Sequence, residues 1–341
     1  MNARGVVHLC SSLAHAGLAM AACARAMTSR DLCVVIDDAR GVARARALGL
    51  IVDAHIAPAM RRPAMASRAL RHLLCETDCD QRTLVAWGAH LEPLVTATSG
   101  EQIVVDFDRG MIERFPGSLR GPGPIRTLGA PDAPLCEPLG ADARAAWRSR
   151  MSLSPEDRAV ALAGIDASEC DVPDFVHVLG MLHFAKVPVV GVVDRAQMSR
   201  HRAAIRRARE AMPDLRVLLR DEPMLAWIGA CDAAVLSPGD RFDSGPTSRR
   251  FDAPLLAASI AHAGVAVIVA ERDAGEASDP RVVRVESAHP AVMARALRQS
   301  LESAPSEASA GDRQLAAHAW RRALAAVADP PAVGAIAGAT A

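Results

Sequence analysis

The chain has 341 residues, of which half are hydrophobic and 3% are aromatic. This length exceeds that of one ordinary domain and is typical of two domains of roughly 150 residues each. Lysine plus arginine equals aspartate plus glutamate at 39 each, so bulk charge gives no indication of a nucleic-acid partner.

The first half of the chain alternates short apolar runs with amphipathic segments. The apolar runs predict strands over Gly5–Cys10, Leu32–Asp37, Ile51–Ile56, Thr83–Trp87 and Ile103–Asp108. Helical periodicity predicts helices over Ala16–Met27, Arg40–Leu48 and Ala64–Cys75. Strands that are apolar throughout and separated by helices indicate a parallel sheet covered on both faces.

Residues 109–157 interrupt this alternation, and two Gly/Pro-rich stretches within them, Gly117–Pro124 and Pro131–Pro138, indicate a domain junction. The pattern then restarts. Strands are predicted over Ala159–Ile165, Val187–Asp194, Leu215–Leu219, Ala233–Leu236, Val265–Ala270 and Val282–Val285. Helices are predicted over Val172–Ala185, Gln197–Met212, Pro223–Ala230, Pro254–Ala263 and Pro290–Ser303.

We therefore predict two α/β domains in tandem, each doubly wound and Rossmann-like, over residues 1–138 and 139–312. A last helix and a loose tail are expected over residues 313–341. Ligands of such sheets bind outside the carboxyl ends of the strands, so two of these domains facing each other would enclose a cleft.

Eight cysteines are scattered singly along the chain, at positions 10, 23, 33, 75, 79, 136, 170 and 231. The closest pair, Cys75 and Cys79, has no second pair at the short spacing that a zinc site requires. We therefore expect no metal site, and reduced thiols that pack as small apolar groups, as in a cytoplasmic protein. The sequence also has no Gly-x-Gly-x-x-Gly after the first strand and no Walker motif, so no NAD or ATP cofactor is expected.

Three stretches of the second half form a recognisable pattern. Glu222–Pro238 (EPMLAWIGACDAAVLSP) has a helix, an Ala-Ala-Asp-type turn and a strand closed by Ser-Pro. Ser259–Ile268 (SIAHAGVAVI) is similar to a Glu-Ala-Met-Ala-x-Gly-x-Pro-Val-Val motif, and Leu139–Asp157 contains an Arg-rich helix. Together these stretches resemble the C-terminal domain of the retaining glycosyltransferases of family 4, which have the GT-B fold.

The first half matches the same family more loosely, through Ser12–Gly17 (SLAHAG) in the first strand–helix loop and Thr83–Gly88 (TLVAWG) at a strand end. The resemblance covers nearly the whole chain. It implies a GT-B fold, with two Rossmann-like domains facing across a cleft. The first domain would hold the acceptor, and the second would hold a nucleotide-sugar donor.

The family's charged donor-binding residues are missing at the matching positions. Where the resemblance implies an Arg and a Lys, the loop Asp166–Asp171 (DASECD) is acidic, and acidic groups repel a leaving diphosphate. Phe251 and Ser259 occupy the positions of the family's glutamate pair, and Val85 that of a histidine. No catalytic residue is therefore assigned.

Four residues are the donor-binding candidates. Arg249 and Arg250 precede the helix predicted from Pro254, and arginines at a helix N-terminus bind phosphate well, although a solvated loop is the alternative. Ser259 could donate a weak hydrogen bond. Arg220 follows a strand where the family's nucleotide base packs, with a solvated arginine as the alternative. Asp243 is a further candidate, as a displaced carboxylate.

On the acceptor side, the candidates for contact with acceptor or phosphate are His15, Gly17, Trp87 and Gly88. For His15 the alternative is a surface histidine, and for Gly17 it is a glycine that permits close approach of helix and strand. For Trp87 the alternative is a tryptophan packed in the core. The segment Arg195–Arg209 carries six arginines and could contact anionic lipid at a peripheral membrane surface. It has no interleaved aromatic residues, so nucleic acid is not expected, and a solvated helix face is the alternative.

Three functions stay open. The first is a divergent glycosyltransferase that moves a sugar from a nucleotide-sugar donor to an acceptor the sequence does not identify. The second is a catalytically inactive relative that binds a sugar, a nucleotide or a partner protein. The third is a sugar-nucleotide epimerase, which no residue favours. We favour the enzyme, because the loop Gly239–Arg250 could supply replacement groups, and we expect it in the cytoplasm.

Overall fold

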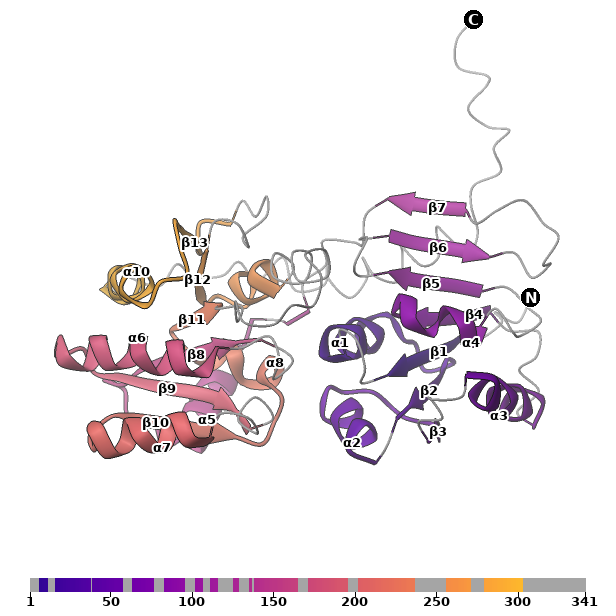
Figure 1. The fold of residues 1–341 in the computed structure, drawn as a ribbon, viewed down its shortest axis with the longest axis horizontal. Helices are drawn as coiled ribbons and strands as arrows, with labels where there is room; N and C mark the ends of the chain where they lie inside the picture. The colour runs from indigo at the N-terminus through magenta and orange to yellow at the C-terminus, as the bar shows by residue number, and fades with distance from the viewer. Residues whose placement is uncertain are drawn as a thin grey trace, which may run out of the picture. The chain divides into compact units, whose positions relative to one another are not determined.

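A computed structural model shows the arrangement of the elements (Figure 1). It describes residues 6–11, 16–37, 39–57, 63–76, 83–95, 102–106, 111–115, 125–128, 135–136, 138–164, 171–195, 202–236, 256–270 and 279–302. The predicted final helix and tail over 313–341 lie outside these ranges. The chain divides into two compact units, an N-terminal unit built on Met1–Ala133 and a C-terminal unit, Pro134–Arg313.

The N-terminal unit contains one sheet whose described strands have the order β3-β2-β1-β4-β5-β6-β7. Its first five strands pair in parallel. The strands are β1 (Val6–Ser11), β2 (Leu32–Ile36), β3 (Ala54–Ile56), β4 (Thr83–Trp87), β5 (Gln102–Asp106), β6 (Met111–Phe115) and β7 (Ile125–Leu128). The helices are α1 (Ala16–Ala26), α2 (Ala39–Ala47), α3 (Pro63–Glu76) and α4 (Glu92–Val95), with a 3-10 turn, η1 (Ala89–Leu91).

The parallel sheet predicted from the first five strands is confirmed, but the sequence did not predict the last two strands of this unit. β5 pairs with β6, and β6 with β7, in antiparallel fashion. Only residues 107–110 connect β5 to β6, which is too short for the helical crossover that a parallel neighbour requires. The Gly/Pro-rich flanks of this region concealed both strands, although Met111–Phe115 (MIERF) breaks the apolar pattern of the parallel strands.

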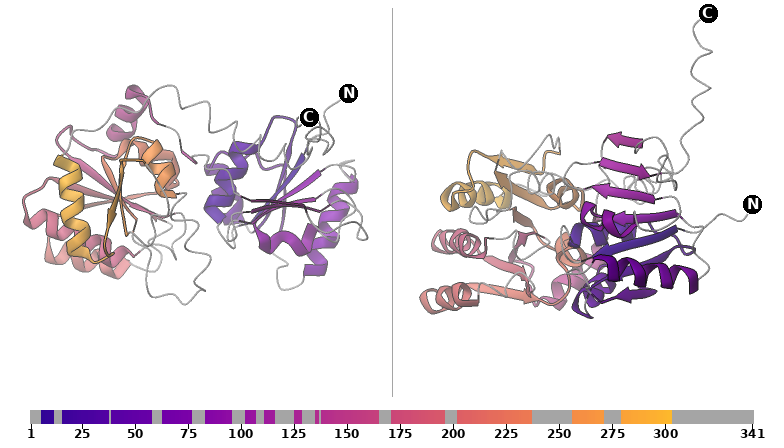
Figure 2. Two further views of the ribbon diagram at one scale, coloured as in Figure 1. Left: turned by 90° about the horizontal axis from the view of Figure 1, so that it is seen from above. Right: turned by 45° about the vertical axis from the view of Figure 1, so that its right-hand side comes forward.

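Helices cover both faces of this sheet. On one face, α3 and α4 pack against a core that includes Leu9, Val34, Ile36 and Leu84, all buried. On the other face, α1 and α2 contact β1 and β2. The views in Figure 2 show helices on either side of the strands. Because the strands are buried from both sides, they are apolar throughout, which is why their positions could be predicted from composition.

The C-terminal unit contains a second sheet, all parallel in its described strands, with the order β10-β9-β8-β11-β12-β13. The strands are β8 (Arg158–Ala163), β9 (Val189–Asp194), β10 (Arg216–Arg220), β11 (Ala233–Leu236), β12 (Ala266–Ala270) and β13 (Val282–Val285). The helices are α5 (Ala141–Arg150), α6 (Val172–Phe184), α7 (Arg202–Ala211), α8 (Met224–Trp227), a 3-10 turn η3 (Ile228–Ala230), α10 (Pro290–Glu302) and a helical segment over 256–262.

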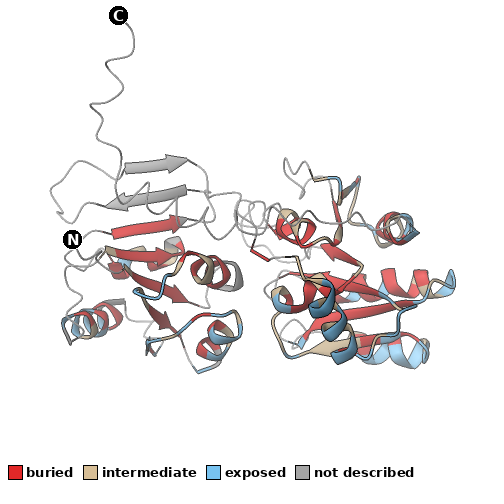
Figure 3. Cartoon of the chain, turned by 180° about the vertical axis from the view of Figure 1, so that it is seen from behind, coloured by how far each residue is buried: buried red, intermediate tan, exposed pale blue. Residues whose placement is uncertain are grey.

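This unit is also closed by helices on both faces. A large apolar cluster joins α6, α7 and α10 to one face of the sheet, with Phe175, Leu179 and Leu297 fully buried. In Figure 3 the inner strands are buried along most of their length, while the edge strands β10 and β13 are partly exposed and the outward faces of the helices are exposed. Each unit is therefore a doubly wound, Rossmann-like α/β domain, as predicted. None of the helices in the described part of the chain combines the length and the hydrophobicity that a membrane crossing requires.

Candidate functional site

The carboxyl edge of the C-terminal sheet is the place where a doubly wound domain binds ligands. The strand order reverses between β8 and β11, so a ligand is expected where these two strands end, at Ala163 and Leu236. The loops that follow them, residues 165–170 and 237–255, lie outside the described residues. Arg249, Arg250, Asp243 and Phe251 belong to the second loop, and their predicted roles stay predictions.

Arg220 ends β10 at this edge, and an acid holds its side chain. Its Nη2 donates to both carboxylate oxygens of Glu222 at 2.7 Å, and its Nε donates to Oε2 at 3.1 Å. Burial raises the pKa of Glu222, but backbone hydrogen bonding and the Arg220 guanidinium outweigh it, so the net pKa lies below the ordinary value. The Glu222 carboxylate therefore stays ionised near neutral pH. A diphosphate reaching Arg220 would compete with a carboxylate already in place.

The neighbouring arginine is paired as well. Arg195, which follows β9, places its Nε 2.7 Å from Oδ1 of Asp221. Both side chains are more than half exposed, so this ion pair contributes little to stability. Asp194, the residue before Arg195, is buried and lies opposite Arg220 in the β9–β10 register. At the described ends of β9 and β10, the two arginines Arg195 and Arg220 therefore lie among three acids, Asp194, Asp221 and Glu222.

Asp171, the last residue of the acidic loop, caps helix α6. Its carboxylate accepts a hydrogen bond from the backbone N–H of Asp174 at 3.0 Å. A carboxylate at this position satisfies a free N–H of the first helical turn and interacts favourably with the helix dipole. Asp171 therefore already occupies a place where a phosphate oxygen could otherwise bind. Asp166 and Glu169, the other acids of this loop, lie outside the described residues.

Ser259, the residue matched to one of the family's glutamates, lies in the helical segment 256–262 and has no exposed surface. Its Oγ accepts from the backbone N–H of Leu135 at 3.0 Å, and its carbonyl accepts from the Cys136 thiol at 2.9 Å. These contacts join residues 135–136 to the segment beside β12. The donor-binding role of Ser259 stays a prediction.

The four acceptor-side candidates of the N-terminal unit differ in position and in burial. His15 lies outside the described residues, and Gly17 is the second residue of α1. Trp87 ends β4 but is fully buried, and its Nε1 donates to Nδ1 of His8 at 3.0 Å. Gly88 is buried too, with a φ of +122° that favours glycine, and its N–H donates to the Val105 carbonyl at 2.9 Å.

His8 is a buried polar residue that sequence reasoning passed over, inside the apolar strand GVVHLC. Since its Nδ1 accepts from Trp87, its ring proton lies on Nε2, 3.6 Å from Oδ2 of Asp31. Asp31 also accepts from the N–H groups of Val6 and Thr28 and from the Thr28 hydroxyl. Asp31, Val6 and Thr28 lie at the amino ends of β1 and β2, whereas sheets of this kind bind ligands at their carboxyl ends, and Trp87 is fully buried, so we assign the network to structure.

Comparisons with known proteins found similar structures but no similar sequences. No protein-family model matches the chain, and no curated protein sequence does. A glycosyltransferase from Rickettsia africae ESF-5 is similar in structure, with a TM-score of 0.52 and 9% identity over 96% of this chain and 98% of that one. This chain has the GT-B fold.

Two further solved structures of the same architecture are similar at lower scores. The ADP-heptose LPS heptosyltransferase II of E. coli gives a TM-score of 0.49, with 12% identity over 87% of this chain and 98% of that one. HepE from Anabaena, in complex with UDP and glucose, gives 0.48, with 10% identity over 95% of each chain. The GT-B fold that the resemblance implied rests on the Rickettsia africae structure, and identities this low do not assign a donor or an acceptor.

Proposed function

We propose that this protein is a glycosyltransferase that moves a sugar from a nucleotide-sugar donor to an acceptor. One observation carries the proposal: both units are doubly wound domains, and the chain aligns over 96% of its length with a glycosyltransferase at a TM-score of 0.52. The sequence motifs around Glu222–Pro238 and Ser259–Ile268, which resemble those of family 4 enzymes, support the same function.

The chemistry requires stabilisation of the leaving diphosphate. Negative charge builds up on its oxygens as the glycosidic bond breaks, and arginines or helix N–H groups can bind them. The side chains of Arg195 and Arg220 are already paired with acids. We therefore propose that Arg249 and Arg250, which precede the helical segment 256–262, supply the positive charge in place of the family's Arg and Lys.

A donor panel tests the function. The protein is screened by thermal shift against UDP-, GDP- and ADP-sugars, and the stabilising donor is then assayed for release of its nucleoside diphosphate. We expect one nucleotide class to raise the melting temperature, with a stabilisation that grows with the logarithm of ligand excess. Stabilisation by none of them would contradict the proposal.

A paired variant tests the residues. Arg249→Ala combined with Arg250→Ala should weaken donor binding by roughly 100-fold or more, since each lost charge-assisted hydrogen bond is worth about 1.5–3 kcal/mol and the variant loses two of them. Arg295→Ala, at an exposed arginine on α10, is the matched control and should bind the donor normally. Equal binding by all three proteins would exclude the two loop arginines as the diphosphate contacts.

A catalytically inactive nucleotide-sugar-binding protein is the second candidate. The pairing of Arg195 and Arg220 with acids and the use of Asp171 as a helix cap favour it. Donor binding without release of nucleoside diphosphate, with or without added acceptor glycans, would support this candidate and contradict the enzyme.

A cytoplasmic location and peripheral membrane contact through α7 also belong to the proposal. In α7, Nε of Arg206 lies 3.8 Å from Oε1 of Glu210, and Nη2 of Arg209 donates to the Val217 carbonyl. Two of the arginines of this helix therefore already have partners within the protein. Co-sedimentation with anionic vesicles tests the contact, with neutral vesicles as the control. Equal binding to the two kinds of vesicle would contradict it.

A further inference from the structure

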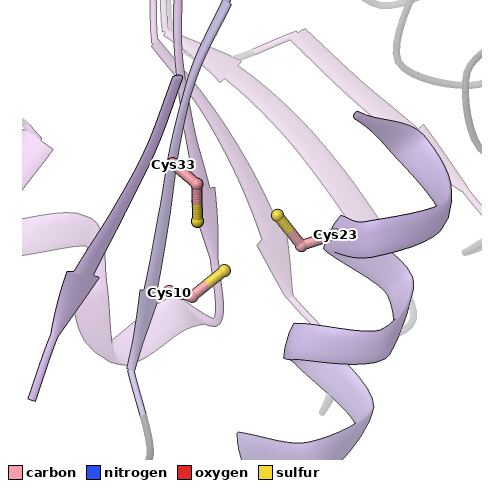
Figure 4. Close-up of side chains that lie close together, drawn as sticks. All are labelled: Cys10, Cys23 and Cys33. Atoms are coloured by element: carbon pink, nitrogen blue, oxygen red, sulfur yellow. The ribbon is translucent and has the colours of Figure 1, made fainter. Parts of the chain in front are cut away.

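Three cysteines that are far apart in the sequence meet in the core of the N-terminal unit. Cys10 lies on β1, Cys23 on α1 and Cys33 on β2, and all three are fully buried. Their sulfur atoms lie within 4.8 Å of one another. Figure 4 shows the three side chains pointing toward a common point between the two strands and the helix.

The parallel register of β1 and β2 explains this convergence. His8 is paired with Cys33, and Cys10 with Val35, so Cys10 and Cys33 project from the same face of the sheet two residues apart in register. Helix α1 covers this face and contributes Cys23 from its inner side. The spacings of 13 and 10 residues match no local metal-binding motif, so only the tertiary structure brings the thiols together.

The arrangement has the dimensions of a three-sulfur metal site. A cation bound in the plane of three sulfurs at about 2.3 Å, the metal–sulfur distance of zinc thiolate sites, holds these sulfurs about 4.0 Å from one another. The cysteine sulfurs already lie within 4.8 Å, so small side-chain adjustments would close the triangle. Each thiol that becomes a ligand releases its proton to solvent, so binding strengthens as pH rises.

The number and the type of ligands indicate which cation the site would bind. Among the described residues, the group of converging ligand atoms consists of the three thiols, with no fourth ligand. Structural zinc sites have four protein ligands, and open zinc sites complete their coordination with water, which a fully buried apolar pocket does not admit. Soft thiolate ligands favour Cu(I), which does not require a fourth ligand. We propose that Cys10, Cys23 and Cys33 form a binding site for one Cu(I) ion.

Such an ion would connect α1 to both strands that it covers. The site is distinct from the carboxyl edge of the C-terminal sheet, and the inference does not depend on the proposed glycosyltransferase activity. Metal binding in the core of the N-terminal unit would therefore appear as stabilisation of that unit, because only the folded state holds the three thiols together.

A competition titration tests the site. The reduced protein is titrated anaerobically with Cu(I) in the presence of a chromogenic Cu(I) chelator. We expect uptake of one equivalent, and X-ray absorption of the loaded wild type should show about three sulfur neighbours near 2.3 Å. Cys23→Ala should lose affinity by roughly 100-fold or more, because removal of a ligand exceeds the 10- to 100-fold losses typical of changes around one.

Two controls match this variant. Cys231→Ala removes a buried thiol of the C-terminal unit, and Cys75→Ala removes an exposed one of the N-terminal unit. Both should bind copper as the wild type does. No uptake by the wild type, nitrogen or oxygen ligands in its absorption spectrum, or an equal loss in the control variants would overturn the site. Preference for Zn(II) in the same competition would overturn the choice of ion. If Cys23→Ala does not fold, the X-ray absorption spectrum of the copper-loaded wild type still tests whether three sulfur atoms bind the ion.

Discussion

Asp232 joins helix α5 to the C-terminal sheet, and its removal gives a sharp test of the packing. The residue lies just before β11, with 17% of its side chain exposed. Its carboxylate accepts from Nη2 of Arg144 at 2.8 Å, from Nη1 of Arg148 at 3.1 Å and from the backbone N–H of Ala159 at 2.8 Å. One carboxylate thus connects α5, β8 and the start of β11.

The expected loss of stability depends on how exposed the arginine partners of Asp232 are. Charge-assisted hydrogen bonds contribute about 1.5–3 kcal/mol each, but about a third of the Arg144 side chain is exposed, so solvent screens that contact. Arg148 keeps other acceptors, the carbonyls of Ser154 and Asp157. We therefore expect Asp232→Ala to lower the free energy of unfolding by about 3 kcal/mol, less than the sum of its three bonds. Asp232→Asn should lower it by about half as much, because an amide oxygen in the place of Oδ2 still accepts from Arg148 and from the Ala159 N–H.

Urea denaturation checks this estimate. With a slope of about 2 kcal/mol per molar urea, the midpoint of the alanine variant should fall by about 1.5 M. Fluorescence of Trp147 and Trp227 reports on the C-terminal unit, and hydrogen exchange should show earlier opening of α5. A shift below about 0.3 M, or unchanged protection of α5, would refute the view that Asp232 holds this helix in place. The double variant with Arg144→Ala should be more stable than the sum of the two single effects predicts.

Three further substitutions or conditions test the N-terminal and C-terminal cores. Gly88→Ala should cost about 1–3 kcal/mol, because Gly88 has a φ of +122° and a Cβ would lie 2.6 Å from the His90 ring; an unchanged melting temperature would contradict this. Gly191→Ala should lower the free energy of unfolding by about 1–3 kcal/mol, because the added methyl group overpacks against Leu179. Thermal melting measures this loss, and a stabilising effect would contradict it. Burial opposes ionisation of Asp31, but its hydrogen bonds outweigh burial and lower its pKa below the ordinary value of 3.8. The stabilisation from Asp31 is therefore complete above about pH 4 and decreases as pH falls toward the lowered pKa, so Asp31→Asn should be less stable than the wild type at pH 7 and approach it in acid; a constant difference across a pH series of urea titrations would contradict the assignment.

The amino-acid sequence determined the two domains and nearly all of their strands. Runs such as residues 189–193 (VVGVV) are buried on both faces of a parallel sheet, so every residue in them is apolar or small, and this signal is local. It failed for β6 and β7, because antiparallel strands do not need a continuous apolar run and Gly/Pro-rich segments flank this pair.

Only the tertiary structure decided which groups have partners. Arg220 is a donor-binding candidate in the sequence, yet the carboxylate of Glu222, two residues away, forms an ion pair with it, and Asp171 caps a helix. The meeting of Cys10, Cys23 and Cys33 depends on strand register and on the placement of α1, neither of which leaves a trace in local spacing. Local periodicity fixes where elements lie along the chain, but contacts between residues distant in sequence arise only when those elements pack.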